Sequence, residues 1–296
     1  MITAENHESP GSQPDASPPL LRGFGETLSS GPVAAATLVL AVMILIAITV
    51  PFLGTLDPFR IVPGSRLAPV SSEFWFGTDA LGRDVFARTL YGTRTSLVVG
   101  VVAASVSIAA GLLIGVIAGY FRLADAIIMR FMDGLMAIPG IVLAVALVSI
   151  AGASLATVLV AIVVPEIPRV VRLVRGVILN LRNEPYVEAA ISLGTPLPKL
   201  LFRHLIPNTM APLIVQGSFI LASAILTEAA LSFLGVGLPP EVPSWGNIMS
   251  EGRRYFQLLP GLIFFPGVFL AITVLSVNIL GDALRDALDP KLARKI

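Results

Sequence analysis

The chain has 296 residues, of which 55% are hydrophobic and 13% are charged, and its mean hydropathy is +0.87. Soluble domains carry roughly 25% charged residues, so this composition indicates a polytopic membrane protein. A net charge of +1 does not indicate a nucleic-acid partner, the lack of cysteine excludes disulfides, and two histidines cannot form a histidine-rich metal site.

The N-terminal segment, residues 1–32, is rich in Pro, Ser and Gly and holds four acidic residues against one arginine. It lacks the basic start and the cleavage site of a signal peptide. We therefore expect residues 1–32 to form a disordered cytoplasmic tail.

Apolar runs that are largely free of charge predict six membrane spans, each long enough to cross a hydrocarbon core of ~30 Å. The long run from Gly134 to Pro165 is divided at Ala151-Gly152-Ala153-Ser154. The expected spans are 33–53, 95–121, 134–150, 155–174, 211–236 and 260–281. The fold class is therefore all-α, with 54–94 as an outer loop, 95–282 as the membrane core and 283–296 as a tail.

Lys and Arg assign the orientation, because inner loops carry an excess of these residues. If both termini are inside, 13 of the 20 Lys and Arg fall on inner segments. We expect both termini to be cytoplasmic, although the outer segment 60–94 holds five arginines.

The second span carries a stripe of small residues at four-residue spacing. Such a stripe allows another helix to approach closely, and a role in lining a pore is the alternative. The residues are Ala103, Ser107, Gly111, Gly115 and Gly119.

Two charged segments flank this span. Arg83, Arg88 and Arg94 alternate with apolar residues, which predicts an outer interfacial helix with arginines that reach toward the lipid headgroups. Asp125 and Asp133 are expected on the solvated face of another interfacial helix that enters the third span.

A basic helical hairpin at 183–207 interrupts the apolar chain. Asn183 or Glu184 can cap a first helix with a proline in its first turn. Gly194 follows where a left-handed C-terminal cap is expected. Thr195 can cap a second helix, which Pro207 is expected to end before the fifth span.

The first helix of this hairpin has a surface that suits a partner protein. Tyr186 begins two helical turns, Ala189 and Ala190 are small enough for a groove to close around them, and Glu188 offers one charge. The alternative is a hairpin that only joins two spans.

The order Glu188-Ala189-Ala190, three residues, Gly194, then a stretch ending at Pro207 resembles the coupling motif of permeases in binding-protein-dependent ABC importers. The segment 203–208, with His204 before the proline, departs from the general motif and is similar to its dipeptide/oligopeptide/nickel branch. Further similar segments lie at 76–79, 82–85, 92–97, 226–229, 231–235, 243–246 and 278–290.

This resemblance implies a permease subunit that forms the translocation pathway for di- or oligopeptides, glutathione or a nickel chelate. The implied partners are a second related permease, two cytoplasmic ATPases that grip one coupling helix from each permease (184–194 in this chain), an extracytoplasmic binding protein and membrane lipid, with no nucleic acid. No Gly-x-x-x-x-Gly-Lys-[Ser/Thr] motif occurs, so the chain is expected to be no enzyme and to hold no cofactor, with ATP and Mg on the partner ATPases. The implied location is a bacterial inner membrane.

Ionisable residues inside spans are functional candidates because their burial in lipid is costly. Glu228 lies within the fifth span, where structural hydrogen bonding, gating and substrate contact are alternatives. Glu166 and Arg169 are three residues apart and can pair on one helical face near two prolines, which permit a bend.

Aromatic and basic residues before the sixth span suggest an outer contact surface. Trp245 is expected to be an interfacial anchor. The resemblance implies that 238–259 is where the binding protein docks, with Arg253 and Arg254 meeting its acids. Lipid headgroup contact is the alternative.

Two other function classes are considered. A secondary transporter or channel favours charges at the midplane and an inverted repeat, but only Glu228 lies deep and no repeat is found. An intramembrane enzyme requires a nucleophile with a base or metal ligands at depth, and no histidine falls within an expected span.

Overall fold

A computed structural model describes residues 30–54 and 57–288. Most of the expected tail at 1–32 lies outside the described residues, as does the end of the expected tail at 283–296. The longer helices are α2 (Gly31–Thr49), α3 (Val85–Tyr120), α4 (Arg122–Met136), α5 (Gly140–Ala151), α6 (Leu155–Leu181), α9 (Ile206–Phe233) and α11 (Gly261–Leu288). The shorter ones are α7 (Pro185–Ser192), α8 (Leu197–Leu200), α10 (Trp245–Gly252), the π-helix η3 (Leu201–Leu205), and the 3₁₀ turns η1 (Val50–Phe52), η2 (Pro63–Ser65) and η4 (Arg253–Tyr255).

Side-chain caps mark three of the helix starts. Asp84 accepts a hydrogen bond from the backbone N–H of Phe86 at the start of α3. Ser154 at α6 and Ser244 at α10 accept from the backbone N–H three residues further on. These contacts satisfy donors that a helix N-terminus otherwise leaves without a partner.

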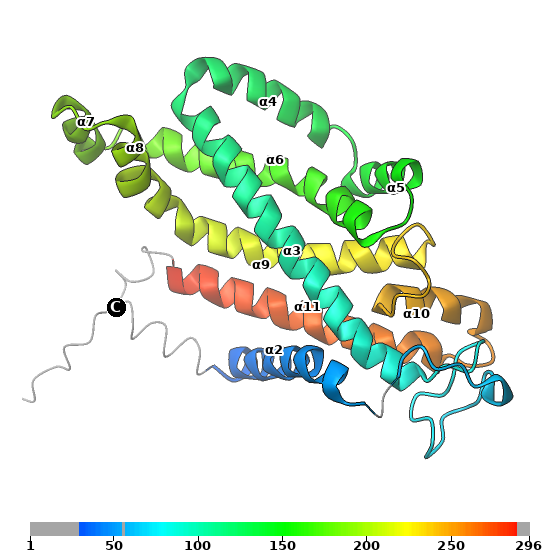
Figure 1. Ribbon diagram of the computed structural model, residues 1–296. Helices are drawn as coiled ribbons and strands as arrows, with labels where there is room; N and C mark the ends of the chain where they lie inside the picture. The colour runs from blue at the N-terminus through cyan, green and yellow to red at the C-terminus, as the bar shows by residue number, and fades with distance from the viewer. Residues whose placement is uncertain (1–29, 55–56, 289–296) are drawn as a thin grey trace, which may run out of the picture.

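The long helices form a bundle with different structures at its two ends. Figure 1 shows α7 and α8 at one end, and α10 beside the N-terminal part of α3 at the other. Helix α3 packs along α6 and α9, while α11 packs against α9 and α2. Four helical segments are long and apolar enough to cross a membrane: 31–52, α3, 197–233 and α11.

Helices α4 and α5 are bent by 86° at the break between them, and they supply a fifth span only if the pair together crosses the membrane. Helix α6 corresponds to the remaining expected span. It is long enough but not apolar enough to count with the others, because Glu166, Arg169 and Arg172 interrupt its apolar sequence. The multi-pass character of the chain is therefore confirmed, and the count of six stays a prediction.

The small-residue stripe on α3 is a helix-packing surface, as expected. A Cβ added to Gly115 would lie 2.7 Å from the Cβ of Val174, and one added to Gly119 would lie 2.8 Å from the Cβ of Ile178. These distances are shorter than real contacts, so α6 lies against α3 at a distance that larger side chains would prevent.

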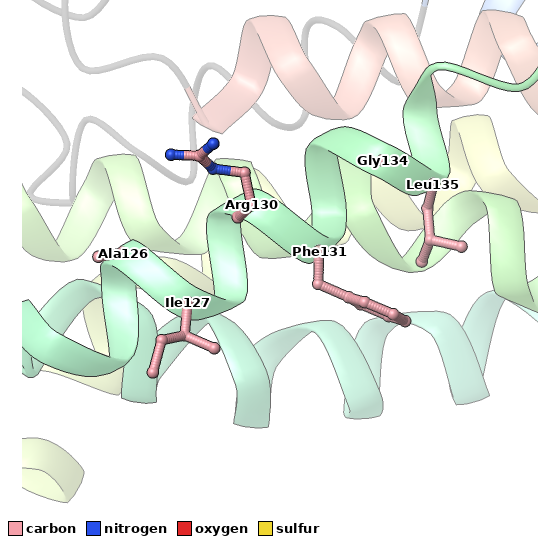
Figure 2. Close-up of a pocket in the computed structure, with 6 residues that line it drawn as sticks. All are labelled: Ala126, Ile127, Arg130, Phe131, Gly134 and Leu135. Carbon is pink, nitrogen blue, oxygen red and sulfur yellow. The ribbon is translucent and has the colours of Figure 1, made fainter.

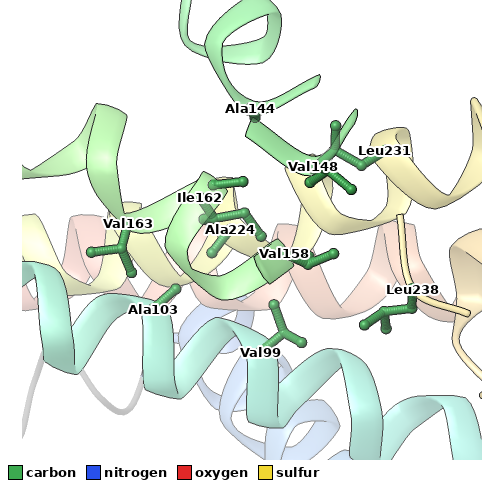
Figure 3. Close-up of a cluster of buried hydrophobic side chains, with 11 residues drawn as sticks. Val99, Ala103, Ala144, Val148, Val158, Ile162, Val163, Ala224, Leu231 and Leu238 are labelled. Atoms are coloured by element: carbon green, nitrogen blue, oxygen red, sulfur yellow. The ribbon is translucent and has the colours of Figure 1, made fainter. Parts of the chain in front are cut away.

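A hydrophobic core joins α3, α5, α6 and α9, mostly through small and β-branched side chains. Figure 3 shows Val99 and Ala103 of α3 near Val158 of α6, with Val148 of α5 and Leu231 of α9 on the other side. Because these residues come from four helices, their burial fixes the helices relative to one another.

The structure corrects the expected start of the second span. Helix α3 begins at Val85 and runs without a break to Tyr120, so Arg88 and Arg94 belong to the same helix as the small stripe. The expectation of a separate interfacial helix before residue 95 is therefore wrong. No proline lies between residues 85 and 95, so helical backbone hydrogen bonding can continue through this segment.

Candidate functional site

The first hairpin helix, α7, ends in the glycine cap that its sequence predicts. Gly194 has a φ of 75°, and its N–H donates to Ile191 O at 2.9 Å. The N–H of Thr195 donates to Ala190 O at 3.1 Å, which completes a Schellman motif. At the other end Glu184 occupies the N-cap position before Pro185, although its side chain accepts no capping bond.

The second half of the hairpin differs from expectation. Thr195 does not cap a helix, because Pro196 occupies the N-cap position of α8. Pro207 does not end the helix either: α8 continues through η3 into α9. The N–H of Ile206 bonds five residues back to Leu201 O, and a wider π turn of this kind accommodates a proline that has no N–H of its own.

A side chain satisfies one of the carbonyls beside this proline. Asn208 Nδ2 donates to His204 O at 2.6 Å. The helix therefore passes through Pro207 with little loss of hydrogen bonding, and η3 joins the hairpin directly to α9. Residues 197–233 thus form one continuous helical segment.

Three buried side chains anchor the hairpin to the bundle. Val187 of α7, Leu200 of α8 and Leu205 of η3 are each at most 1% exposed. They join a cluster that includes Val174 and Ile178 of α6. This anchoring was not predicted, because apolar residues recur throughout the hairpin and the fold decides which of them face the bundle.

The hairpin residues expected to contact a partner lie mostly on its outer surface. Glu188 and Ala189 are exposed, as are Gly194 and Pro207, whereas Ala190 is half-buried and packs toward the bundle. Glu188 forms no ion pair with any residue that the structure describes. Its carboxylate is therefore free to meet a charge on another protein.

Tyr186 and His204 come together from opposite halves of the hairpin. Their ring centroids are 6.3 Å apart, and Tyr186 is 45% exposed. The pair links α7 to η3, so the two halves present one surface. Three exposed apolar side chains add to it and were missed from the sequence: Ile191 (49%), Leu193 (87%) and Phe202 (72%).

Arg182 connects the base of the hairpin to the end of α3. Its guanidinium donates to Tyr120 O at 2.9 Å and lies 5.2 Å from the centroid of the Tyr120 ring. Cations interact favourably with the carbonyl end of a helix. The end of α6, directly before the hairpin, is thus held against the end of α3.

The expected pair within α6 forms. Arg169 donates to both carboxylate oxygens of Glu166, at 2.8 and 3.1 Å, and Ser223 of α9 lies 3.5 Å from the nearer one. Glu166 is buried, while the Arg169 side chain is 56% exposed. This pair therefore places a buried carboxylate between α6 and α9.

The acids of α4 pair with arginines of α6, a pairing that was not predicted from the sequence. Asp133 pairs with Arg172 at 2.6 Å, and Asp125 accepts hydrogen bonds from Arg175. The Asp133 side chain is still 56% exposed, so that pair lies on the solvated surface as expected, whereas the Asp125 side chain is only 22% exposed. Figure 2 shows a different side of α4, where Ile127 and Phe131 line an apolar hollow of about 650 Å³.

Glu228 of α9 is fully buried in a cluster of serines. Ser232 Oγ donates to its carboxylate at 2.9 Å, and Ser96 Oγ of α3 donates at 3.4 Å. Ser244, before α10, is also a hydrogen-bond partner. Ser232 additionally accepts from the N–H of Leu238 at 3.2 Å. The carboxylate thus joins α3, α9 and the segment before α10.

Trp245 is not a surface anchor, so that expectation is wrong. Its side chain is 0% exposed, and its indole N–H donates to Thr89 O at 3.1 Å. Gly92 leaves space for it, since a Cβ there would lie 3.1 Å from the indole ring. A buried indole with a satisfied N–H has no surface to offer a docking protein.

A charge network lies beside Trp245. Arg83 bonds to Asp79 at 2.6 Å and to Glu251 of α10 at 2.8 and 2.9 Å. Arg88, also 0% exposed, reaches Glu251 at 3.3 Å. Burial raises the pKa of Glu251, and the charges of Arg88 and Arg83 oppose that rise.

Two of the three arginines expected to reach toward headgroups are therefore buried, because Asp79 and Glu251 supply partners inside the fold. Arg253 and Arg254 of η4 are exposed, and the Arg253 guanidinium lies 5.5 Å from the centroid of the Phe233 ring. Within the described ranges, no group of three or more His, Cys, Asp and Glu side chains is arranged to hold a metal ion.

The sequence of this chain is similar to those of known transport proteins. Residues 111–294 match the profile of a family described as binding-protein-dependent transport system inner membrane component. The chain is 53% identical to a probable peptide ABC transporter permease protein of Sinorhizobium fredii, over 81% of this chain and 82% of that one. It is 39% identical to the dipeptide transport system permease protein DppC of Alkalihalophilus pseudofirmus, over 99% and 96% of the two chains.

A third relative and a solved structure extend the comparison. The glutathione transport system permease protein GsiD of Pectobacterium atrosepticum is 45% identical over 75% of this chain and 74% of its own. A chain of the inward-facing MetNI methionine ABC transporter has a TM-score of 0.54 at 19% identity, covering 68% of this chain and 96% of that one. At this identity the likeness concerns the fold alone.

Proposed function

The chain belongs to the family of binding-protein-dependent transport system inner membrane components, and we propose that it is one permease subunit of an ATP-driven importer. Its proposed role is to form part of the translocation pathway, with no catalytic residue of its own. The proposed location is a bacterial inner membrane with both termini in the cytoplasm, in agreement with the distribution of Lys and Arg.

The proposed assembly contains a second, related permease, two cytoplasmic ATPases that bind ATP and Mg, and an extracytoplasmic solute-binding protein. The absence of a phosphate-binding Gly-x-x-x-x-Gly-Lys-[Ser/Thr] motif from the chain supports hydrolysis by a partner. Arg253 and Arg254 are exposed at the end opposite the hairpin, where acidic groups of the solute-binding protein can reach them.

The hairpin carries this proposal. Its inner side is anchored by Val187, Leu200 and Leu205, while its outer side exposes Glu188 and several apolar side chains. A hairpin that only joined two spans would not need exposed apolar residues beyond the bundle. We assign ATPase contact to Tyr186, Glu188, Ala189, Ala190, Gly194, His204 and Pro207.

Peptides of a few residues, or a related solute such as glutathione or a nickel chelate, are the proposed cargo. The relatives named above support peptides and glutathione, since their names state peptide, dipeptide and glutathione transport. Glu228, Glu166 and Arg169 are proposed as parts of the pathway or its gate. For Glu228 the serine cluster supports a gating or structural role over direct contact with cargo.

Reversing the exposed charge on α7 tests the hairpin assignment. We expect Glu188→Lys to reduce peptide uptake at least tenfold, because the new charge repels a basic partner group. Uptake and ATP hydrolysis are measured together in proteoliposomes that contain the whole complex and the binding protein. Glu73→Lys is the matched control: it reverses an exposed acid in the segment before α3, which lies at the end of the bundle opposite the hairpin, and it should change neither rate.

Normal uptake by Glu188→Lys would contradict the assignment of α7 as the contact helix. Isolation of the tagged chain from its own membrane adds a second measurement. Recovery of an ATPase, a second permease and a binding protein supports the importer. A chain that moves solute without ATP and without partners would instead be a secondary transporter or channel.

A further inference from the structure

A polar hollow lies at the end of the bundle opposite the hairpin. Its volume is about 530 Å³, and its walls come from the loop before α3, the α5–α6 connection, the end of α9 and the α10–η4 segment. Small residues shape it, including Ala80, Ala153 and Gly235. Small-molecule sites have volumes of roughly 300–1,000 Å³, so the hollow is large enough for a peptide of two or three residues.

Charges of both signs line this hollow. Arg253 and Arg254 of η4 contribute two guanidinium groups, and Glu241 of the α9–α10 loop contributes an exposed carboxylate. Among the described residues, neither arginine has a carboxylate within 4.0 Å. The two guanidinium groups therefore keep their capacity to bind a carboxylate from a ligand.

One wall of the hollow is formed by paired charges. Glu251 and Arg83 line the hollow and bond to one another, while Asp79 holds Arg83 from behind. Arg88 braces Glu251 from within the fold, and its Nε and Nη1 atoms are buried without a hydrogen-bond partner. The positive charge of Arg88 keeps this wall from being acidic, so an anionic group can approach.

We propose that this hollow is a receiving site for short zwitterionic peptides, with the α-carboxylate bound by Arg253 and Arg254 and the α-ammonium held near Glu241. The inference rests on the proposed function, because it names where cargo first meets this chain. A concave site with separated charges fits a small zwitterion better than the broad surface of a protein.

Photolabelling tests the proposal directly. The probe is tri-alanine carrying a photoreactive diazirine, applied to the whole transporter in lipid nanodiscs without its binding protein. We expect label on residues 234–255, displaced by excess tri-alanine but not by its C-terminal amide or its N-acetyl form. Arg254→Gln should reduce labelling about tenfold, the effect of losing one charge-assisted hydrogen bond.

Two controls distinguish the site from a docking surface. Arg94→Gln removes an exposed arginine of α3 that lies outside the hollow, and it should leave labelling unchanged. Stimulation of ATP hydrolysis by the binding protein is measured on the same variants. If Arg254→Gln abolishes that stimulation but leaves labelling intact, the arginines contact the binding protein and the proposal is wrong.

Equal displacement by tri-alanine and its amide would also overturn the proposal, since no carboxylate would then be recognised. Failure of the proposed function gives a different result. In that case the unmodified complex shows no ATP-dependent uptake of tri-alanine with its binding protein present. Uptake with normal kinetics in Arg254→Gln and Glu241→Gln, with unchanged labelling, rejects the receiving site alone.

Discussion

Glu228 shows how one buried carboxylate can hold three parts of a membrane protein together. Ser96 of α3, Ser232 of α9 and Ser244 before α10 all hydrogen-bond to it. Burial of a carboxylate is unfavourable unless hydrogen bonds compensate it, and here three hydroxyls surround it. The residue is therefore a joint between elements, and its side chain has no exposed surface.

Two substitutions at Glu228 distinguish a structural role of this residue from contact with the cargo. Glu228→Ala leaves the serine hydroxyls without their common acceptor, which costs roughly 1–3 kcal/mol per unsatisfied group. We expect a lower thermal unfolding midpoint for the alanine variant in detergent and a nearly normal one for Glu228→Gln, which keeps the shape and an acceptor. A Gln variant that unfolds normally but loses its dependence on peptide concentration would point to cargo contact instead.

At the level of elements, the hairpin turn depends on one glycine. Gly194 adopts a φ of 75°, and an added Cβ would meet no atom within 4 Å. Any penalty from substitution there must come from the backbone conformation, because L-residues with a side chain disfavour this region by about 1 kcal/mol or more. The cap fixes the angle between α7 and α8.

Paired glycine substitutions isolate this effect. Gly176 of α6 also has no neighbour within 4 Å of an added Cβ, but it lies in a regular helix. We expect Gly194→Ala to lower the unfolding midpoint and to weaken the link between ATP hydrolysis and uptake. Gly176→Ala should raise stability by up to about 1 kcal/mol and leave that link unchanged. Equal behaviour of the two variants would show that the left-handed cap is unimportant.

At the scale of the whole molecule, the hairpin of α7 and α8 lies at one end of the bundle and the charged hollow beside α10 lies at the other (Figure 1). The hairpin continues into α9 through η3, and α9 carries Glu228 next to the segment that leads to α10. A rigid helix that contacts both ends can transmit displacement from one to the other. We propose α9 as this element, because it alone contains both the hairpin junction and the serine-bound carboxylate within the described ranges.

Introduced cysteines test the membrane orientation of these ends. The chain has no cysteine, so single replacements give an unambiguous signal. Ser192 of α7 and Gln257 after η4 are both exposed. We expect an impermeant maleimide to label Gln257→Cys in intact cells and Ser192→Cys only after permeabilisation. The reverse pattern would show that the topology is inverted and that the hairpin lies outside the cytoplasm, where it could not contact the ATPases.

Local sequence determined much of the fold. Apolar runs identified the helices that cross the bundle, the four-residue spacing of Gly111, Gly115 and Gly119 identified a packing surface, and Gly194 identified the hairpin turn. These features depend on neighbouring residues alone: helix propensity, side-chain volume at helical spacing, and the allowed backbone angles of glycine. The prediction at Pro207 was wrong, because proline usually ends a helix. Here a π turn, in which the N–H of Ile206 bonds five residues back to Leu201 O, lets the helix continue.

Tertiary structure alone decided which charges are paired and which aromatic residues are buried. Arg88 and Trp245 look like surface residues in sequence, yet both are 0% exposed. Asp125 and Arg175 are 50 residues apart, and Arg83 and Glu251 are 168 apart, so no local pattern could join them. The free energy of a buried charge depends on partners brought close by the fold, and that information is absent from the residues beside it in the chain.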